Sequence, residues 1–171
     1  SPLTVNIGSI VQFNDLTINA PTSWQWSFPG GTPSTSTLQN PTVTYNTLGM
    51  YDVHLIATNS FGSDTILQTD YINSVNYTYM CNSTSTTAAT GLLFDSGGPT
   101  GDYQSSEACS LLIEPAFADT VILSFVSFNT ETNWDYFKVY DGTSTSDPMV
   151  MNMSGTVLPP DVVCPSGKML I

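Results

Sequence analysis

Residues 125–142 read FVSFNTETNWDYFKVYDG, and this stretch decides the fold class of the chain. Side chains alternate between two faces along its first residues and again along 134–140, and the run closes on Asp141-Gly142. Alternation with period two is typical of β-strands, and Asp-Gly is a tight-turn signal. The stretch therefore predicts two strands of a sheet, joined by a short acidic connection.

The composition excludes several classes of function. The 171 residues include 14 acidic and two basic side chains, which gives a net charge of −12 at pH 7. So few cations cannot neutralise phosphate groups, so we expect no binding to nucleic acid or to an anionic membrane surface. No apolar run approaches the roughly 20 residues that span a bilayer. The chain opens on Ser1-Pro2-Leu3 and stops within an apolar run, so we expect it to be part of a longer protein.

Cysteine and histidine are too scarce for zinc chemistry. The three cysteines fit no zinc-binding spacing, and His54 is the single histidine, which excludes an HExxH site in this chain. A Ser-His-Asp triad would need the same histidine, and no nucleophile-elbow motif accompanies it. A disulfide in a chain with few charges favours an extracellular setting.

The order of short strands predicts two domains. Residues 1–75 contain about seven strands at a spacing typical of a β-sandwich, in which Trp24, Trp26 and Phe28 share one face and form a core anchor. Residues 76–89 show no apolar period and predict a linker. Residues 90–171 contain further short strands, and no segment has the helical period, so almost no helix is expected.

The first segment resembles the PKD family of immunoglobulin-like domains. The resemblance lies in WQWSFPGG (24–31), NPTVTY (40–45), GMYDVHL (49–55) and ATNSFGSD (57–64). The wording is similar to PKD modules of secreted and cell-surface proteins of the Bacteroidota. It implies a spacer, or a weak contact to protein or polysaccharide, and not a catalyst.

The second segment, 81–171, resembles the CUB family, an antiparallel β-sandwich of extracellular proteins. The resemblance lies in GLLFDSGG (91–98), LSF (123–125), DYFKVYDG (135–142), Cys81, Tyr103 and Cys109. It implies that Cys81 pairs with Cys109, which ties Cys81 to this domain and leaves Cys164 either buried and free or paired outside the chain.

The chain departs from the CUB pattern in two places. The positions of the second disulfide of the family fall near Asn133 and Ser154, and neither is cysteine. The closing strand of the family would lie beyond Ile171, so the resemblance predicts a C-terminally incomplete sandwich with an open edge.

Glu131 and Asp135 are the candidate metal ligands. They match the first two of three acidic positions through which many CUB domains bind Ca²⁺, and the third would lie beyond Ile171. Calcium takes about six to eight oxygen ligands, of which two carboxylates supply a part. The alternative is a solvated acidic loop tip.

Three other features are weaker candidates. Trp134, beside Asp135, is a candidate ligand contact that could stack on a sugar if it is exposed. Thr65 and Thr120 each stand between Asp and a hydrophobic residue, which resembles the O-glycosylation signal of Bacteroidota. Asp95 and Asp102 flank a Gly-rich loop, where a role in turns is favoured over ligand contact.

These observations predict an all-β protein of two tandem β-sandwiches, the first PKD-like and the second a CUB-like jelly roll. The expected function is a non-catalytic extracellular region of a larger secreted or cell-surface protein, which binds protein or polysaccharide. One alternative is a set of accessory modules of a secreted pappalysin-like zinc metalloprotease. Another is a subunit of an extracellular filament, in which a neighbouring copy fills the open edge near Ile171. Apart from Ca²⁺, no cofactor is expected.

Overall fold

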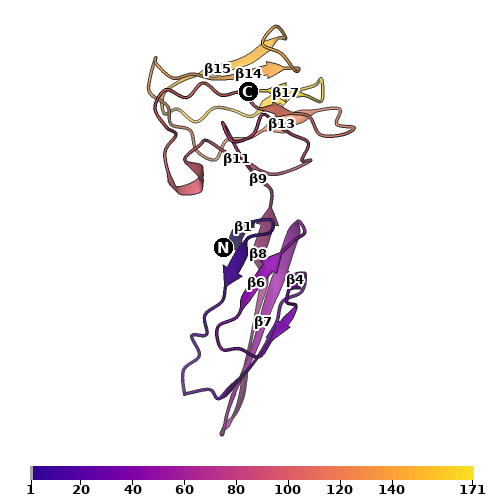
Figure 1. Ribbon diagram of the computed structural model, residues 1–171, viewed down its shortest axis with the longest axis vertical. Helices are drawn as coiled ribbons and strands as arrows, with labels where there is room; N and C mark the ends of the chain where they lie inside the picture. Colours follow the sequence, from indigo (N-terminus) through magenta and orange to yellow (C-terminus); the bar gives the residue numbers. More distant parts are fainter. Residues whose placement is uncertain (1) are drawn as a thin grey trace. The chain divides into compact units, whose positions relative to one another are not determined.

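The computed structural model describes residues 2–171, which divide into two compact units, one up to Tyr77 and the other from Thr78 to Ile171 (Figure 1). Apart from the three-residue 3-10 helix η1 (Gly98–Thr100), the regular structure of the described residues is entirely strand. This confirms the predicted all-β fold class of two β-sandwich domains. None of the described helices has the length and apolar character needed to cross a membrane.

The first unit is built from two facing sheets. The larger has the order β1-β8-β7-β3-β5 and the smaller the order β2-β6-β4. Figure 1 shows β7 and β8 as a long hairpin along the unit. The strands are β1 (Leu3–Asn6), β2 (Ile10–Gln12), β3 (Ser23–Ser27), β4 (Gly31–Thr32), β5 (Thr35–Ser36), β6 (Thr42–Tyr45), β7 (Gly49–Asn59) and β8 (Gly62–Val75).

Aromatic side chains from both sheets fill the core of this unit. Trp26 in β3 and Phe28, directly after it, lie on the same inner face, and both are buried. The Phe28 ring lies 4.7 Å from the ring of Phe13, centroid to centroid. Rings at this spacing combine a large buried apolar area with favourable tilted contacts. The predicted core anchor is therefore present, although Trp24 is only half-buried at its margin.

Asp15 holds the loop that follows β2 against this core. Its carboxylate accepts hydrogen bonds from Trp24 Nε1 at 2.8 Å, from Gln39 Nε2 at 3.3 Å and from Thr17. Desolvation raises the pKa of Asp15, but these hydrogen bonds favour the charged form and together lower the pKa below its usual value. The hydrogen bond from the Trp24 indole N–H to Asp15 keeps Trp24 half-buried, because its polar partner lies at the edge of the core.

The second unit contains one five-stranded sheet, in the order β10-β12-β17-β14-β15, and two strand pairs, β13-β16 and β11-β9. Its core is apolar and includes the fully buried Val139, Cys164 and Met169. The strands are β9 (Tyr77–Tyr79), β10 (Ser85–Thr86), β11 (Leu92–Phe94), β12 (Leu112–Ile113), β13 (Val121–Leu123), β14 (Phe137–Asp141), β15 (Met149–Met153), β16 (Val162–Cys164) and β17 (Met169–Leu170).

The linker prediction for 76–89 is corrected by two strands within that stretch. β9 pairs with β11, and β10 pairs in parallel with β12, in the register Ser85 to Leu112. Thr, Ser and Tyr suit a half-exposed strand even without an apolar period, because β-propensity reflects packing on a pleated surface. The stretch therefore belongs largely to the second unit.

The strands predicted within 125–142 are shorter than the alternation indicates. β13 already ends at Leu123, and β14 begins only at Phe137. Between them, the half-buried Phe125 and Phe128 pack edge to face with ring centroids 5.8 Å apart, and the ring of Phe137 lies 5.6 Å from that of Phe125. The alternation of side chains along 125–128 therefore reflects packing of these aromatic rings. Such packing does not require the backbone to pair with a neighbouring strand.

The predicted open edge near Ile171 is wrong. β17 lies between β12 and β14, so it is an inner strand of its sheet. Ile171 is buried, and it exchanges backbone hydrogen bonds of 2.9 and 3.0 Å with Leu111. The edges of this sheet are β10 and β15. The strand β16, which the sequence does not predict, lies elsewhere and buries the free Cys164.

Candidate functional site

The predicted acidic connection forms a tight turn anchored at both ends. The backbone N–H groups of Trp134 and Asp135 both donate to the carbonyl of Glu131, at 3.1 and 3.0 Å. At its start, Thr130 donates its N–H to the carbonyl of Gly155 and accepts the N–H of Gly155 on its hydroxyl. The turn that carries both candidate calcium ligands is thus held to the segment after β15.

Tyr103 ties this turn to a second loop. Its hydroxyl donates to Asp135 Oδ2 at 2.6 Å and accepts the backbone N–H of Glu131 at 3.1 Å. The hydrogen bond to the Asp135 carboxylate raises the pKa of Tyr103, because it favours the neutral phenol. The hydroxyl therefore orients the Asp135 carboxylate and the Glu131 backbone together.

A hydrogen bond occupies the place of the missing disulfide. The Asn133 backbone N–H donates to Ser154 Oγ at 3.1 Å, and these are the two positions near which the second CUB disulfide falls. Asn133 adopts a φ of +66°, in the left-handed region that Asn tolerates better than most residues. The same two segments stay joined, but by a noncovalent contact that solvent can exchange.

Trp134 projects from this turn into solvent. Its side chain is 78% exposed, and the nearby Tyr136 is 49% exposed. Glu131 is exposed and Asp135 is half-buried. The turn thus presents one large aromatic ring beside two carboxylates, on a backbone held by hydrogen bonds from two other loops.

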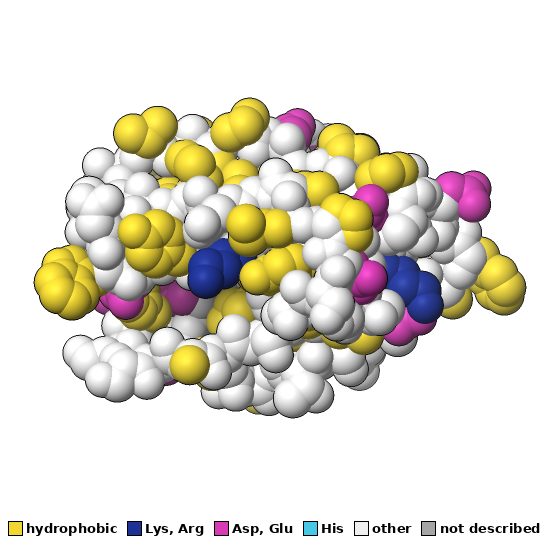
Figure 2. Space-filling view, turned by 90° about the horizontal axis from the view of Figure 1, so that it is seen from above, with side chains coloured by type: hydrophobic (Ala, Val, Ile, Leu, Met, Phe, Trp, Pro, Cys, Tyr) yellow, Lys and Arg dark blue, Asp and Glu magenta, His cyan; other side chains and the backbone are white. Residues whose placement is uncertain are grey.

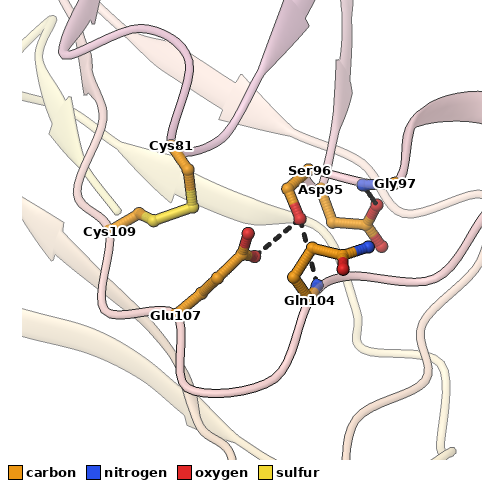
Figure 3. The surroundings of a disulfide bond; sticks show 7 residues. All are labelled: Cys81, Asp95, Ser96, Gly97, Gln104, Glu107 and Cys109. Atoms are coloured by element: carbon orange, nitrogen blue, oxygen red, sulfur yellow. Dashed lines mark hydrogen bonds between the residues drawn. A yellow bond between two sulfur atoms is a disulfide. The ribbon is translucent and has the colours of Figure 1, made fainter.

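The predicted disulfide between Cys81 and Cys109 is present and joins the start of the unit to the loop before β12. Figure 3 shows Glu107 beside it, with the Glu107 carboxylate accepting a 2.6 Å hydrogen bond from Ser96 Oγ. The two sulfur atoms and a Glu107 oxygen lie within 4.8 Å of one another. Because the sulfurs are bonded to each other, they offer no thiolate to a metal ion.

The Gly-rich loop has the turn role that its sequence favours. Asp95 Oδ1 accepts the N–H of Gly97 at 2.9 Å (Figure 3). The same oxygen accepts the N–H of Gly98 at 3.1 Å. A Cβ on Gly97 would lie 2.2 Å from the carbonyl oxygen of Asp102, so this close approach requires glycine. Asp95 therefore shapes the loop that carries Tyr103.

The remaining predicted residues do not join this turn. Thr65 lies in β8 and Thr120 precedes β13, and both are exposed, as a modification site requires. His54 lies half-buried in β7, opposite Leu67 of β8 and Ser27 of β3, where it lines a shallow groove of about 540 Å³ with Gln25. Nothing in this groove resembles a catalytic arrangement.

Sequence reasoning missed the part played by Tyr103. The sequence marks Tyr103 as a family residue, but nothing in its neighbourhood indicates a partner 32 positions away. The acidic partner Asp135 is conspicuous, whereas a tyrosine hydroxyl has many possible partners. Only the folded chain brings the two loops together.

The charged side chains of the second unit are mostly acidic, and its cations are few. Lys168 forms an ion pair with Glu114 at 2.5 Å, which leaves Lys138 as the only other lysine of the chain. Figure 2 shows a face of mainly hydrophobic and uncharged polar side chains, with lysine in two places. The excess of acidic over basic side chains makes this unit unfavourable to anions.

Comparison with known proteins supports this architecture. Residues 3–74 match the model of the PKD domain, and residues 81–171 match that of the CUB domain. The chain is 39% identical to the multiple epidermal growth factor-like domains protein 8 of rat and of mouse, over 72 residues. The human protein of that name matches to the same degree. These matches cover 42% of this chain but only 2–3% of the relatives. The chain belongs to the CUB domain family, with a PKD domain preceding its CUB domain.

Proposed function

We propose that these residues form a non-catalytic binding region of a larger secreted or cell-surface protein, and that the turn 130–135 is its contact surface. PKD and CUB domains are typical of extracellular adhesion and binding modules. The observation that carries the proposal is Trp134, a tryptophan left 78% exposed on a turn that hydrogen bonds hold to two other segments. Binding energy at interfaces concentrates in aromatic anchors of this kind.

The charges beside Trp134 favour a protein partner with a basic side chain. Glu131 and Asp135 place negative charge next to the ring, and a Lys or Arg there would meet carboxylates and an aromatic face. The exposed ring also supports a second partner class, a neutral polysaccharide that stacks on it. Salt distinguishes the two, since screening weakens charge pairing but leaves stacking nearly unchanged.

Calcium at Glu131 and Asp135 remains part of the proposal. Carboxylates that bind metals are commonly hydrogen-bonded themselves, and the Tyr103 bond to Asp135 fits that pattern. Across residues 2–171 no third carboxylate, thiolate or imidazole gathers with these two. The fit is therefore partial, and Glu131 and Asp135 would supply two of the oxygen ligands of a weak site.

The contact surface is tested by a matched pair of variants. The intact chain is screened against immobilised extracellular proteins and neutral polysaccharides, and each hit is measured again with Trp134→Ala and Phe117→Ala. Phe117 is a fully exposed aromatic residue of the same unit and is not part of the turn 130–135. We expect Trp134→Ala to weaken binding about tenfold or more, and Phe117→Ala to leave it unchanged. Equal losses in both variants would contradict the assignment.

Calcium is tested by calorimetric titration into chelator-treated protein. Wild type should release or absorb heat that Glu131→Ala removes and Asp161→Ala retains. Asp161 is an exposed acidic residue of the same unit, outside the turn. Absence of heat in the wild type rules out the calcium site but leaves the Trp134 contact open.

A further inference from the structure

The strand β8 has a long free edge in the first unit. It has 14 residues, and β1 covers only Ile72–Val75 at its end. On its other side, β8 pairs with β7 without a break from Gly62 to Gln68, and the register shifts only beyond that point. No strand of the described residues lies on the outer side of 62–68, where every residue is exposed. The unpaired backbone groups of such an edge are a template for a further strand.

The hairpin geometry identifies the backbone groups that are free. Asn59 and Gly62 pair across a two-residue turn, and such a closing pair exchanges two backbone hydrogen bonds. An antiparallel ladder bonds every second residue, so the N–H and C=O groups that point away from β7 belong to Ser63, Thr65 and Leu67. These groups have the spacing that an added strand requires.

A carboxylate covers one of these outward groups. The Thr65 N–H donates to Asp64 Oδ1 at 2.8 Å, so the Asp64 side chain lies along the free edge. Charges at an edge oppose pairing, because an acidic or uncharged strand would bury the carboxylate without a partner. A strand that places lysine or arginine beside Asp64 would neutralise it instead. The edge therefore discriminates in favour of a basic strand.

The charge of the first unit favours the same kind of partner. This unit contains neither lysine nor arginine, because both lysines of the chain belong to the second unit. Asp64 and Asp70 are both exposed on β8. A second copy of the chain is a poor occupant, because two molecules with a net charge of −12 repel each other. A basic segment is attracted by the same field.

Apolar side chains on both faces of the edge would contact an added strand. Ile66 is 51% exposed, and Leu67, on the opposite face, is 57% exposed. Cross-strand neighbours on each face of a sheet stabilise its pairing. Valine-like side chains and the methylene stems of lysine or arginine can cover Ile66 and Leu67 while the charged ends reach the carboxylates.

We propose that Gly62–Gln68 is a docking edge for an extended basic segment of another protein, which adds to β8 in line with β1. The parallel pairing of β1 at Ile72–Val75 shows that this side of β8 accepts a strand. The binding is weak, because one short strand buries less than the roughly 1,000 Å² of a stable interface. The proposal concerns the first unit and does not depend on the Trp134 contact in the second.

Three synthetic peptides test the proposal with the intact chain. The first is a blocked, fluorescently labelled peptide in which lysine alternates with valine. The second has the same side chains but carries a methyl group on every backbone nitrogen, so it keeps the charge and cannot donate backbone hydrogen bonds. The third has glutamate in place of lysine. In fluorescence anisotropy, we expect the first to bind, the second to bind about tenfold more weakly or worse, and the third not to bind.

Two variants separate the Asp64 charge from the overall charge of the chain. Asp64→Asn keeps an oxygen for the Thr65 N–H and removes the negative charge, so it should weaken binding of the lysine peptide several-fold. Asp161→Asn makes the same charge change at an exposed site of the second unit and should leave binding unchanged. Equal losses in the two variants overturn the proposal, as does equal binding of the lysine peptide and its methylated form.

Hydrogen exchange locates the peptide on the chain. Saturation with the lysine peptide should slow exchange at the outward amides of Ser63 and Leu67. Protection confined to residues 130–135 would assign the peptide to the turn of the second unit and overturn the edge. A lysine peptide that does not bind overturns it too, and so does self-association of the free chain through 62–68, because a second copy would then be the occupant.

Discussion

The Tyr103 hydroxyl and the Asp135 carboxylate lie 2.6 Å apart, although 32 positions separate them in the chain. The same hydroxyl accepts the backbone N–H of Glu131, so one side chain joins the Gly-rich loop to the turn that bears Trp134. The contact between that turn and the Gly-rich loop therefore depends on a single oxygen atom.

Tyr103→Phe removes that oxygen and keeps the ring. We expect the amides of 131–135 to exchange with solvent several-fold faster, because the Glu131 N–H loses its partner. Hydrogen exchange followed by mass spectrometry measures this directly. Tyr136→Phe is the control, since Tyr136 is half-exposed and outside this network. Unchanged exchange in Tyr103→Phe would show that the turn is held by its other contacts.

Tyr45→Phe should stabilise the first unit. The Tyr45 hydroxyl is buried with no hydrogen-bond partner among the described residues. Removing an unsatisfied buried polar group should raise the free energy of unfolding by about 1 kcal/mol. Chemical denaturation at neutral pH measures the difference. Tyr51→Phe should instead destabilise, because the Tyr51 hydroxyl donates to the carbonyls of Thr47 and Leu48.

The same tyrosine makes the first unit sensitive to alkali. Burial, with a smaller contribution from nearby Tyr51, raises the pKa of Tyr45 from 10 to about 12. Because burial penalises the phenolate, ionisation of Tyr45 costs the fold nothing below pH 10, and stability is lost as the pH rises through 10 towards 12. Tyr45→Phe should therefore flatten the alkaline decline in stability. An identical decline in both proteins would contradict the assignment.

Substitutions at two glycines distinguish the free-energy cost of a strained backbone from the cost of a steric clash. Gly8 and Gly30 have φ values of +80° and +75°, but only at Gly30 would a Cβ collide, 2.2 Å from the Tyr51 ring. Gly8→Ala should cost about 1 kcal/mol for the left-handed backbone. Gly30→Ala should cost about 3 kcal/mol, because the ring must also move. Urea titration compares them, and equal costs would show that the Tyr51 ring yields freely.

The disulfide should stabilise the second unit alone. Cys81 and Cys109 are 28 positions apart, and closing a loop of that length in the unfolded chain is worth about 3–4 kcal/mol. Replacing both with alanine should lower the melting temperature of one calorimetric transition and leave the other in place. A shift of both transitions would show that the two units unfold together.

The sequence by itself determined the fold class and the order of the two domains. Period-two alternation along segments such as Ser23–Ser27 reflects the pleat of a strand, and that signal is local. The family motifs added the Cys81–Cys109 pairing, which the structure contains.

Tertiary structure alone decided which residues meet. The bond between Tyr103 and Asp135, the contact of Asn133 with Ser154 and the inner position of β17 all join segments far apart in sequence. Sequence patterns report which side of a strand is buried, but the pairing of strands and loops depends on the whole chain closing around its cores. The position of β15 at the edge of its sheet was decided in the same way, because it depends on which strands pair with β14 and β17.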